Sequence, residues 1–522
     1  MPRMFRSAAG WLAALSILPF VTGGSCSPTT GTVADGDDTQ TAGIETGAGG
    51  EESAPSGSES AAGEPTGTAD STTDDATSAE ALPDASTGTV THTLSLAAGP
   101  SSEPIRPLLG VNAGPLGLPV DFTQTDLTGE YQALGVTLVR THDFNGPLDM
   151  ATIYPDQNAD PSLESSYDFS DSDAYFAPIV AGGFDVYLRI GDSASTGIGY
   201  PAPDPRAPTN VANWIAAAVH VVGHYTDTAR WGRNAVRYVE IWNEPDAAHF
   251  WDSTPVAFYD LFAQAAIALK AAYPELEIGG PGVTSAAFAS PSGQTWIAGL
   301  LDHCQAAGVP LDFLSWHVYT NDPASIATAT AWFRAQLDAH GYTATESHIT
   351  EWNTDTRAGG VDAEEAVALR DGGRGAAIIS ACWIELQNHG VPVSTFYRGR
   401  DPEADNVEFY GLLGGDGRKK ASALAFSFWS EFANSYSVRY DVSVSTSGAG
   451  TIYAIAGRST SGRVAVLIAN PTDQVLGCSF AGRSGTAELR RISDASDAVE
   501  TYKADVGGVE LPADSVQVIF LP

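Results

Sequence analysis

Residues 108 to 397 alternate between short apolar segments and longer segments of helical pattern. The short segments are rich in β-branched and aromatic residues, as strands are. We expect eight strands, at 108–112, 136–142, 184–190, 236–242, 276–280, 312–319, 347–350 and 393–397. Expected helices between them include 209–227, 256–273, 328–341 and 374–390.

Eight successive strand–helix units of this spacing predict an α/β fold, a (β/α)8 TIM barrel within residues 108–430. The alternative is an open, doubly wound parallel sheet. No glycine-rich nucleotide loop follows the first strand, which disfavours that alternative.

The pattern changes after about residue 430. Short alternating strands joined by Gly, Ser and Asp turns predict a β-sandwich over 431–522. A further strand, "TVTHTLSLAA" (89–98), precedes the barrel, and we expect the segment 89–107 to join that sandwich.

The first 26 residues have the layout of a secretory signal. Two arginines precede an apolar run from Trp11 to Val21, which is too short to span a membrane as a helix. Cys26 follows small residues and resembles the lipidated cysteine of bacterial lipoproteins, although Gly23 stands where such signals usually have leucine. A lipid anchor and plain secretion both stay open. The expected location is secreted or at the cell surface, as an outer-membrane lipoprotein if Cys26 is lipidated.

Residues 27–88 are Gly, Ser, Thr, Ala and acidic residues, with almost nothing to bury. Such a segment cannot offset the entropy of ordering, so we expect a disordered tether. The whole chain carries 63 acidic and 26 basic residues, a net charge of −37, which disfavours nucleic acid or a polyanionic sugar as partner.

The cysteine and histidine patterns do not predict a metal site or a disulfide framework. Cys304, Cys382 and Cys478 lie in apolar runs and are expected to be buried, and neither a CxxC nor an HExxH motif occurs. We therefore expect neither a cofactor nor a metal.

Two glutamates mark expected strand exits, where barrel enzymes do their chemistry. The fourth strand ends in "EIWNEPD", which contains Glu244, and the seventh leads into "ITEWN", which contains Glu351. Glycoside hydrolysis needs one protonated carboxyl and one ionised carboxylate at such a mouth. The pair therefore predicts a glycosidase acting on an oligo- or polysaccharide. Alternatively, each glutamate is a surface charge or a buried ion-pair partner.

Several motifs together resemble clan A of the glycoside hydrolases, and within it family 39. These are "GVNAGPLG", "LVRTHDFNGPLDMATIYPD", "SSYDFSDSDAYFAPIVAGGFDVYLRIGDSAS", "EIWNEPD", "FLSWHVY" and "ITEWNT". The family contains β-xylosidases, α-L-iduronidases and some bacterial exopolysaccharide glycosidases. The resemblance implies a retaining, β-xylosidase-like enzyme or one acting on a polysaccharide, with Glu244 as acid/base and Glu351 as nucleophile.

The resemblance also implies substrate contacts. Asn243 is expected to bond the sugar 2-hydroxyl, and either His317 or Tyr319 to hold the nucleophile ionised. His142 and Asp143 are expected to bind sugar hydroxyls. Trp352, Tyr397 and Trp316 offer flat apolar faces for the sugar ring. For each of these residues, a purely structural role is the alternative.

Four further charged residues are predicted from their positions. Arg140 and Glu240 lie inside the second and fourth strands and are expected to neutralise one another in support of the site. Arg398 and Arg400 either bind an acidic sugar or pair with the acidic loop beside them. The rival functions are a non-catalytic carbohydrate-binding surface protein and an adhesive lipoprotein.

Overall fold

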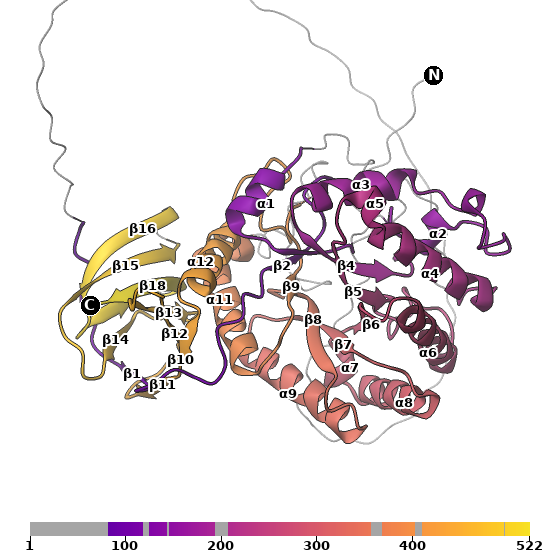
Figure 1. The fold of residues 1–522 in the computed structure, drawn as a ribbon. Coiled ribbons are helices and arrows are strands. Elements are labelled where there is room, and N and C mark those ends of the chain that lie inside the picture. The colour runs from indigo at the N-terminus through magenta and orange to yellow at the C-terminus, as the bar shows by residue number, and fades with distance from the viewer. Residues whose placement is uncertain are drawn as a thin grey trace, which may run out of the picture. The chain divides into compact units, whose positions relative to one another are not determined.

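The structure is a computed structural model that describes residues 82–117, 125–142, 146–193, 207–355, 368–401, 410–494 and 496–522. At its centre lies an eight-stranded sheet in the order β8-β7-β6-β5-β4-β3-β2-β9, in which all neighbours are parallel (Figure 1). A parallel bridge between Ile349 of β8 and Ser394, next to β9, brings the two edges of the sheet together. The sheet is therefore a barrel, as predicted, and the open-sheet alternative is wrong.

The barrel strands follow the predicted order. They are β2 (Gly110–Asn112), β3 (Leu138–Arg140), β4 (Asp185–Ile190), β5 (Val236–Ile241), β6 (Glu277–Val283), β7 (Phe313–Tyr319), β8 (Glu346–Asn353) and β9 (Thr395–Phe396).

Helices of the described residues surround these strands (Figure 1). They are α1 (Thr128–Leu134), α2 (Met150–Ile153), η1 (Glu164–Ser166), α3 (Ser170–Ala181), α4 (Val211–Thr226), α5 (Thr228–Trp231), α6 (Pro255–Ala272), α7 (Ala286–Ala289), α8 (Pro291–Ala307), α9 (Pro323–Ala339), α11 (Gly373–Asn388) and α12 (Ala421–Ser435). Side-chain N-caps and a proline in the first turn begin α6, α8 and α9.

Two strands run further than the sequence pattern predicts: β6 ends at Val283 and not at residue 280, and β8 at Asn353 and not at residue 350. β8 continues through Asn353, so Glu351 lies inside the strand and not beyond its exit. The reason is pairing, because residues 351–353 of β8 lie opposite residues 317–319 of β7 in parallel register. The sequence pattern, which does not show this pairing, predicts the end of the strand at residue 350.

The remaining strands form two further sheets. One has the order β11-β1-β14-β17 and the other β10-β12-β13-β18-β15-β16. Their bounds are β1 (His92–Leu96), β10 (Val438–Tyr440), β11 (Val442–Thr446), β12 (Tyr453–Arg458), β13 (Val464–Asn470), β14 (Leu476–Phe480), β15 (Thr486–Ser493), β16 (Ser496–Asp505), β17 (Val509–Leu511) and β18 (Ser515–Leu521). Side chains from both sheets, including Leu94, Cys478, Val466 and Ile519, form one apolar cluster, so the two sheets make a sandwich.

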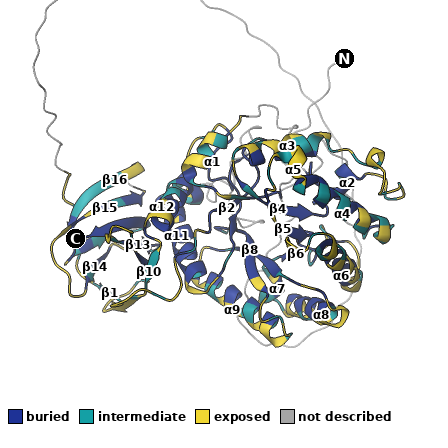
Figure 2. Ribbon diagram, viewed as in Figure 1, coloured by how far each residue is buried: buried dark blue, intermediate teal, exposed yellow. Residues whose placement is uncertain are grey.

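The sandwich packs on two barrel helices. Residues of its six-stranded sheet, such as Val518 and Phe520, belong to the same apolar cluster as Trp383 of α11 and Trp429 of α12. Arg490 of β15 also contacts Glu431 of α12 at 2.7 Å. Figure 2 shows the contrast between buried barrel strands and exposed outer helix faces. α11 differs from the other helices because nearly all of its residues are buried.

The three described cysteines are free thiols and buried, as predicted. Burial raises the pKa of Cys304 and of Cys478 to about 12, so these thiols stay protonated and unreactive at neutral pH.

Cys26, the signal segment and most of the predicted linker lie outside the described residues. The linker prediction is wrong for its described end, because Ala85 N–H donates to the Lys503 carbonyl of β16 at 2.6 Å and Thr87 forms a bridge to Val509 of β17. Within the described part of the chain, no helix is both long enough and apolar enough to cross a membrane.

A substitution at Leu94 tests whether β1 contributes to the core of the sandwich. Its side chain is fully buried between the sheets. Replacing Leu94 with Ala should destabilise the protein by about 2–5 kcal/mol, because a buried leucine side chain leaves a cavity. Denaturant unfolding measures this, with Val475→Ala as control, since Val475 is 64% exposed. An equal effect of both substitutions would contradict the placement.

Candidate active site

Both predicted glutamates lie at the carboxyl-terminal end of the barrel. Glu244 follows β5 and Glu351 lies near the end of β8. Between them in sheet order, β7 contributes His317 and Tyr319. Glu244 and Glu351 are each only 5–6% exposed, so neither is a surface charge.

The backbone after β5 turns Glu244 into the barrel mouth. Trp242 and Glu244 have positive φ values of 78° and 48°, a region that costs about 1–2 kcal/mol for such residues. Hydrogen bonds hold this conformation: Trp242 N–H donates to the Ile190 carbonyl at 2.6 Å, and Glu244 N–H to the Gly282 carbonyl at 2.9 Å. Strain that neighbouring strands enforce is typical of functional sites.

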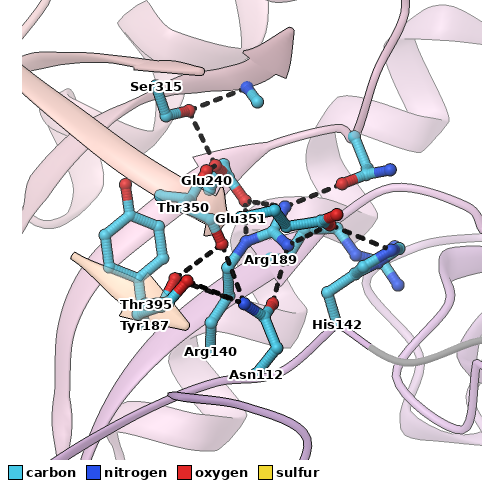
Figure 3. Close-up of polar contacts among 12 residues, drawn as sticks. Asn112, Arg140, His142, Tyr187, Arg189, Glu240, Ser315, Thr350, Glu351 and Thr395 are labelled. Carbon is cyan, nitrogen blue, oxygen red and sulfur yellow. Dashed lines mark hydrogen bonds and ion pairs between the residues drawn. The ribbon is translucent and has the colours of Figure 1, made fainter. Parts of the chain in front are cut away.

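Arg140 lies between Glu240 and Glu351 in the barrel interior (Figure 3). Its guanidinium donates to Glu240 at 2.7 Å and to Glu351 Oε1 at 2.8 Å. Burial by itself lowers the pKa of Arg140, but the two carboxylates outweigh burial and raise it. The predicted Arg140–Glu240 pair is present, and Arg140 also contacts the candidate nucleophile directly.

Two asparagines complete the surroundings of Arg140. Their side-chain oxygens, on Asn112 and Asn243, accept from the guanidinium at 2.9 and 2.8 Å. This fixes the amide orientation of Asn243, so its Nδ2 points the other way. Among the described residues, that buried Nδ2 has no hydrogen-bond partner. A substrate hydroxyl is a suitable acceptor for it.

Alternate residues of β7 reach three different carboxylates. Ser315 Oγ donates to Glu240 at 2.7 Å, His317 Nδ1 lies 2.9 Å from Glu244 Oε1, and Tyr319 Oη donates to Glu351 Oε2 at 2.9 Å. The predicted shared face of the strand is thus correct. Of the two candidates for holding the nucleophile, Tyr319 does so, whereas His317 bonds to Glu244.

The two candidate catalytic carboxyls are close together. One oxygen of Glu244 and one of Glu351 lie within 4.8 Å of each other. Burial, then the charges of Glu351 and Asp246, raise the pKa of Glu244 well above its usual range. Burial raises the pKa of Glu351 too, but Arg140 and the Tyr319 hydroxyl oppose that rise. Their environments therefore favour a protonated Glu244 beside an ionised Glu351.

His142 lies beside Glu351, with its Nε2 3.5 Å from Oε1. Burial and the nearby Arg140 hold the pKa of His142 well below its usual value, so the ring is neutral. Within the described residues its buried Nδ1 has no partner. Asp143, predicted to act with His142, lies outside the described residues. Phe250 packs 6.4 Å from the His142 ring, and only its place in the loop after "WNEP" signals it in the sequence.

Two predicted sugar platforms are wrong. Trp352 packs at 5.1 Å against Trp383 of α11 and donates to Ser394. The β7–β8 register shifts at Thr350, so Thr350 and Glu351 both point inward, and the alternation that resumes after Glu351 points Trp352 outward. Trp316 stacks on Phe333 of α9 for the same reason. Both indoles are thus buried in the layer between strands and helices.

Tyr397 differs from these two tryptophans. Its ring lies 6.2 Å from that of Tyr319 and 5.4 Å from that of Tyr410, in an aromatic group next to Glu351. Tyr397 is only 4% exposed in this position. It therefore forms part of the wall that supports Tyr319.

The arginines after β9 have different surroundings. Arg400 is buried and donates to main-chain carbonyls, including those of Pro115 and Thr125, so its role is structural. Arg398 donates to the Arg400 carbonyl at 2.7 Å, and its charge contributes to the low pKa of His142. The acidic loop 402–409 lies outside the described residues.

Glu244, His317 and Glu351 are also compact enough to surround a cation, the sole such cluster among the described residues. Each of them, however, already has a hydrogen-bond partner within the protein, and the Arg140 cation lies 2.8 Å from Glu351. The group is arranged as a hydrogen-bonded acid pair.

Comparison with known proteins agrees with this geometry. Residues 109–346 match the model of glycosyl hydrolases family 39. Over these residues, which are a little under half of the chain, the protein is similar to glycoside hydrolase family 39. A β-xylosidase of Geobacillus stearothermophilus is 29% identical over 224 residues, which are 40% of this chain and 42% of that relative. The chain thus spans less than half the length of this curated relative.

Two solved structures share the fold of this chain. The glucosidase of Croceicoccus marinus is 23% identical, with a TM-score of 0.65 and coverage of 83% of this chain and 99% of that one. A monomeric β-xylosidase from Caulobacter crescentus is 20% identical, with a TM-score of 0.61 and coverage of 82% and 99%. At these identities the likeness establishes the barrel-plus-sandwich architecture.

Arg140→Met tests the central ion-pair network. Removing the cation leaves Glu240 and Glu351 buried without it, which should cost about 3–5 kcal/mol at neutral pH. Burial, no longer opposed by Arg140, then holds the folded-state pKa of Glu351 above its unfolded value of about 4.3. The variant is therefore most nearly normal below that pH, and its deficit grows as the pH rises.

Denaturant unfolding at pH 4 and pH 7 measures this difference. Arg237→Met is the matched control, because Arg237 lies on β5 but its side chain is 66% exposed. A deficit that does not depend on pH would contradict the network.

Proposed function

We propose that the protein is a retaining glycoside hydrolase that cleaves β-glycosidic bonds, with β-xylosides as the favoured substrates. Glu244 is the acid/base and Glu351 the nucleophile. The main support is that one oxygen of each carboxyl lies within 4.8 Å of the other, and that the two carboxyls have unequal environments. Retaining glycosidases hold their carboxyls about 5–5.5 Å apart, whereas inverting ones leave about 6.5–9.5 Å for a water.

In the first step, an oxygen of Glu351 forms a bond to the anomeric carbon. The glycosidic C–O bond breaks, and Glu244 gives its proton to the departing oxygen. Arg140 and Tyr319 hold the two oxygens of Glu351 before attack, which keeps the carboxylate ionised and oriented. The leaving group departs as an alcohol, and a covalent glycosyl-enzyme remains.

In the second step, Glu244 takes a proton from water, and the water oxygen replaces Glu351 at the anomeric carbon. The change of role follows from the electrostatics. The charge of Glu351 is one of the causes that raise the pKa of Glu244. Once Glu351 is an ester that charge is gone, the pKa of Glu244 falls, and Glu244 becomes a base.

Two buried nitrogens suit a sugar hydroxyl in this site. Asn243 Nδ2 and His142 Nδ1 lack partners among the described residues, and both lie beside the carboxyl pair. Buried polar groups without partners are unfavourable, so a ligand whose hydroxyls accept from Asn243 Nδ2 and pair with His142 Nδ1 gains affinity there. The β-xylosidase relative supports a xylose-like unit within an oligo- or polysaccharide.

A non-catalytic carbohydrate-binding role has no observation in its favour. Such a protein has no need to hold two carboxyls close together, each with its own hydrogen-bond partner. Here both carboxyls are in place, and each has its own partner on β7.

Glu351→Ala and Glu244→Ala test the proposal as a pair. Loss of the nucleophile should lower kcat by about 10³-fold or more for every glycoside. Loss of the acid should lower kcat by about 10²–10⁴-fold for glycosides with poor leaving groups. The fall should be much smaller for activated aryl glycosides, which need little proton donation. Azide should restore turnover partly in both variants.

Steady-state kinetics on a panel of aryl glycosides and xylo-oligosaccharides measure these effects. Glu346→Ala is the control, since Glu346 lies at the opposite end of β8. Proton NMR of the first sugar released should give the retained anomer. Full activity of Glu351→Ala, or an inverted product, would refute the assignment.

We further propose that the chain is exported and tethered to the cell surface through lipidated Cys26, with residues 27–81 as spacer. The support is the order of arginines, apolar run, small residues and cysteine in the sequence. In a bacterial host the wild-type protein should incorporate labelled fatty acid and partition into detergent, whereas Cys26→Ser should do neither. Identical behaviour of the two proteins would favour plain secretion.

A further inference from the structure

A chain of hydrogen bonds leads away from the candidate acid Glu244. His317 Nδ1 lies 2.9 Å from Glu244 Oε1, and its Nε2 lies 3.2 Å from Thr350 Oγ1. Thr350 Oγ1 in turn lies 2.9 Å from Glu240 Oε1 (Figure 3). The side chains of His317, Thr350 and Glu240 are fully buried, so water does not offer alternative partners.

The donor at each link follows from the groups present. Glu240 is paired with Arg140 and also accepts from Ser315, so it is an ionised acceptor. Ser315 Oγ itself accepts from Gly282 N–H at 2.7 Å, which leaves its proton for Glu240. The Thr350 hydroxyl must likewise use its single proton toward Glu240.

The histidine tautomer is then determined. Thr350 Oγ1 has no further proton to give, so it accepts from His317 Nε2–H. If His317 instead carried its proton on Nδ1, two lone pairs would face each other at 3.2 Å. The neutral ring therefore presents the lone pair of Nδ1 to Glu244, and the Glu244 hydroxyl donates to it.

From this geometry we infer that Thr350 is a positioning residue, which, with Glu240, selects the His317 tautomer that keeps Glu244 protonated until it donates to the leaving group. The inference rests on the proposed function of Glu244. Thr350 does not touch the substrate; it acts through His317. Ser315 and Thr350 both hold Glu240 in the orientation that this selection needs.

Other charged and titratable groups act on the same proton. The groups that surround Glu244 and His317 come from four elements: Arg140 and His142 at β3, Glu240 and Asp246 at β5, Tyr319 in β7 and Glu351 in β8. Burial and the Arg140 charge lower the pKa of His317, which keeps the ring neutral. The proton between Glu244 and His317 thus lies on the carboxyl.

Gly282 shows how little space surrounds the hydrogen-bond chain of His317, Thr350 and Glu240. Its φ is 62°, and a Cβ at this position would lie 2.9 Å from His317 Nε2 and 3.2 Å from Glu240 Oε1. A side chain there would displace the ring from Thr350. The absence of a side chain at residue 282 leaves the space that the hydrogen-bond chain occupies.

Thr350→Val removes the acceptor of His317 Nε2–H without a change in shape. The ring should then move its proton to Nδ1 and donate to Glu244, which stabilises the ionised acid. The basic limb of the kcat/KM–pH profile should move down by about one unit, because a hydrogen bond to the charged form lowers a carboxyl pKa. The kcat/KM for glycosides with poor leaving groups should fall by about 10-fold or more, and that for activated aryl glycosides much less.

Two further variants separate this effect from a loss of packing. Thr350→Ser keeps the hydroxyl and should restore the wild-type pH profile. Thr345→Val removes another buried threonine hydroxyl, which donates to the Leu311 carbonyl at 2.7 Å, and should leave the profile unchanged. An unmoved basic limb in Thr350→Val, or failure of Thr350→Ser to restore it, would overturn the inference.

A second readout does not depend on activity. Nitrogen-15 NMR of histidine-labelled full-length protein should assign His317 as the neutral Nε2–H tautomer in the wild type and as Nδ1–H in Thr350→Val. An Nδ1–H signal in the wild type overturns the inference even if the protein is a glycosidase. Conversely, full activity of Glu351→Ala would refute the proposed function, whereas the nitrogen-15 signals of the His317 ring would still decide the role of Thr350.

Discussion

The site depends on one buried cation. Arg140 stands where a barrel interior normally holds branched apolar side chains. It is bonded to two carboxylates and to the side-chain oxygens of two asparagines, all within 2.9 Å. A cation in this place is stable only because these oxygens replace its hydration. The same contacts place Glu351 at the mouth and orient Asn243.

Unequal environments convert two identical side chains into two different reagents. Glu351 has a guanidinium and a phenol as donors. Glu244 has a histidine nitrogen whose lone pair faces it, and Asp246 and Glu351 as negative neighbours. The proton affinity of each glutamate therefore depends on the partners that the neighbouring strands supply. β7 supplies one partner to each carboxyl. Burial increases both effects, because little water is present to screen them.

Much of this could be predicted from the sequence because strand periodicity and position are local properties. The eight strands appear in order, Glu244 and Glu351 both lie at the carboxyl-terminal end of the barrel, and Ser315, His317 and Tyr319 share one face as predicted. The prediction for Trp352 is wrong, because its side chain lies on the helix-facing side of β8 and not in the barrel mouth. Its neighbour Glu351 was read as lying beyond the strand, but β8 continues, and the alternation of side chains points the indole outward.

The sequence by itself determined the barrel, the two candidate carboxyls and the pairing of Arg140 with Glu240, since these follow from periodicity and from charges placed within apolar strands. Only the tertiary structure decided which of His317 and Tyr319 serves which glutamate, and that Thr350 lies between His317 and Glu240. The physical reason is that hydrogen bonds across a barrel depend on the relative register of strands far apart in the chain. A difference of one residue in that register turns a side chain from the interior to the helix layer.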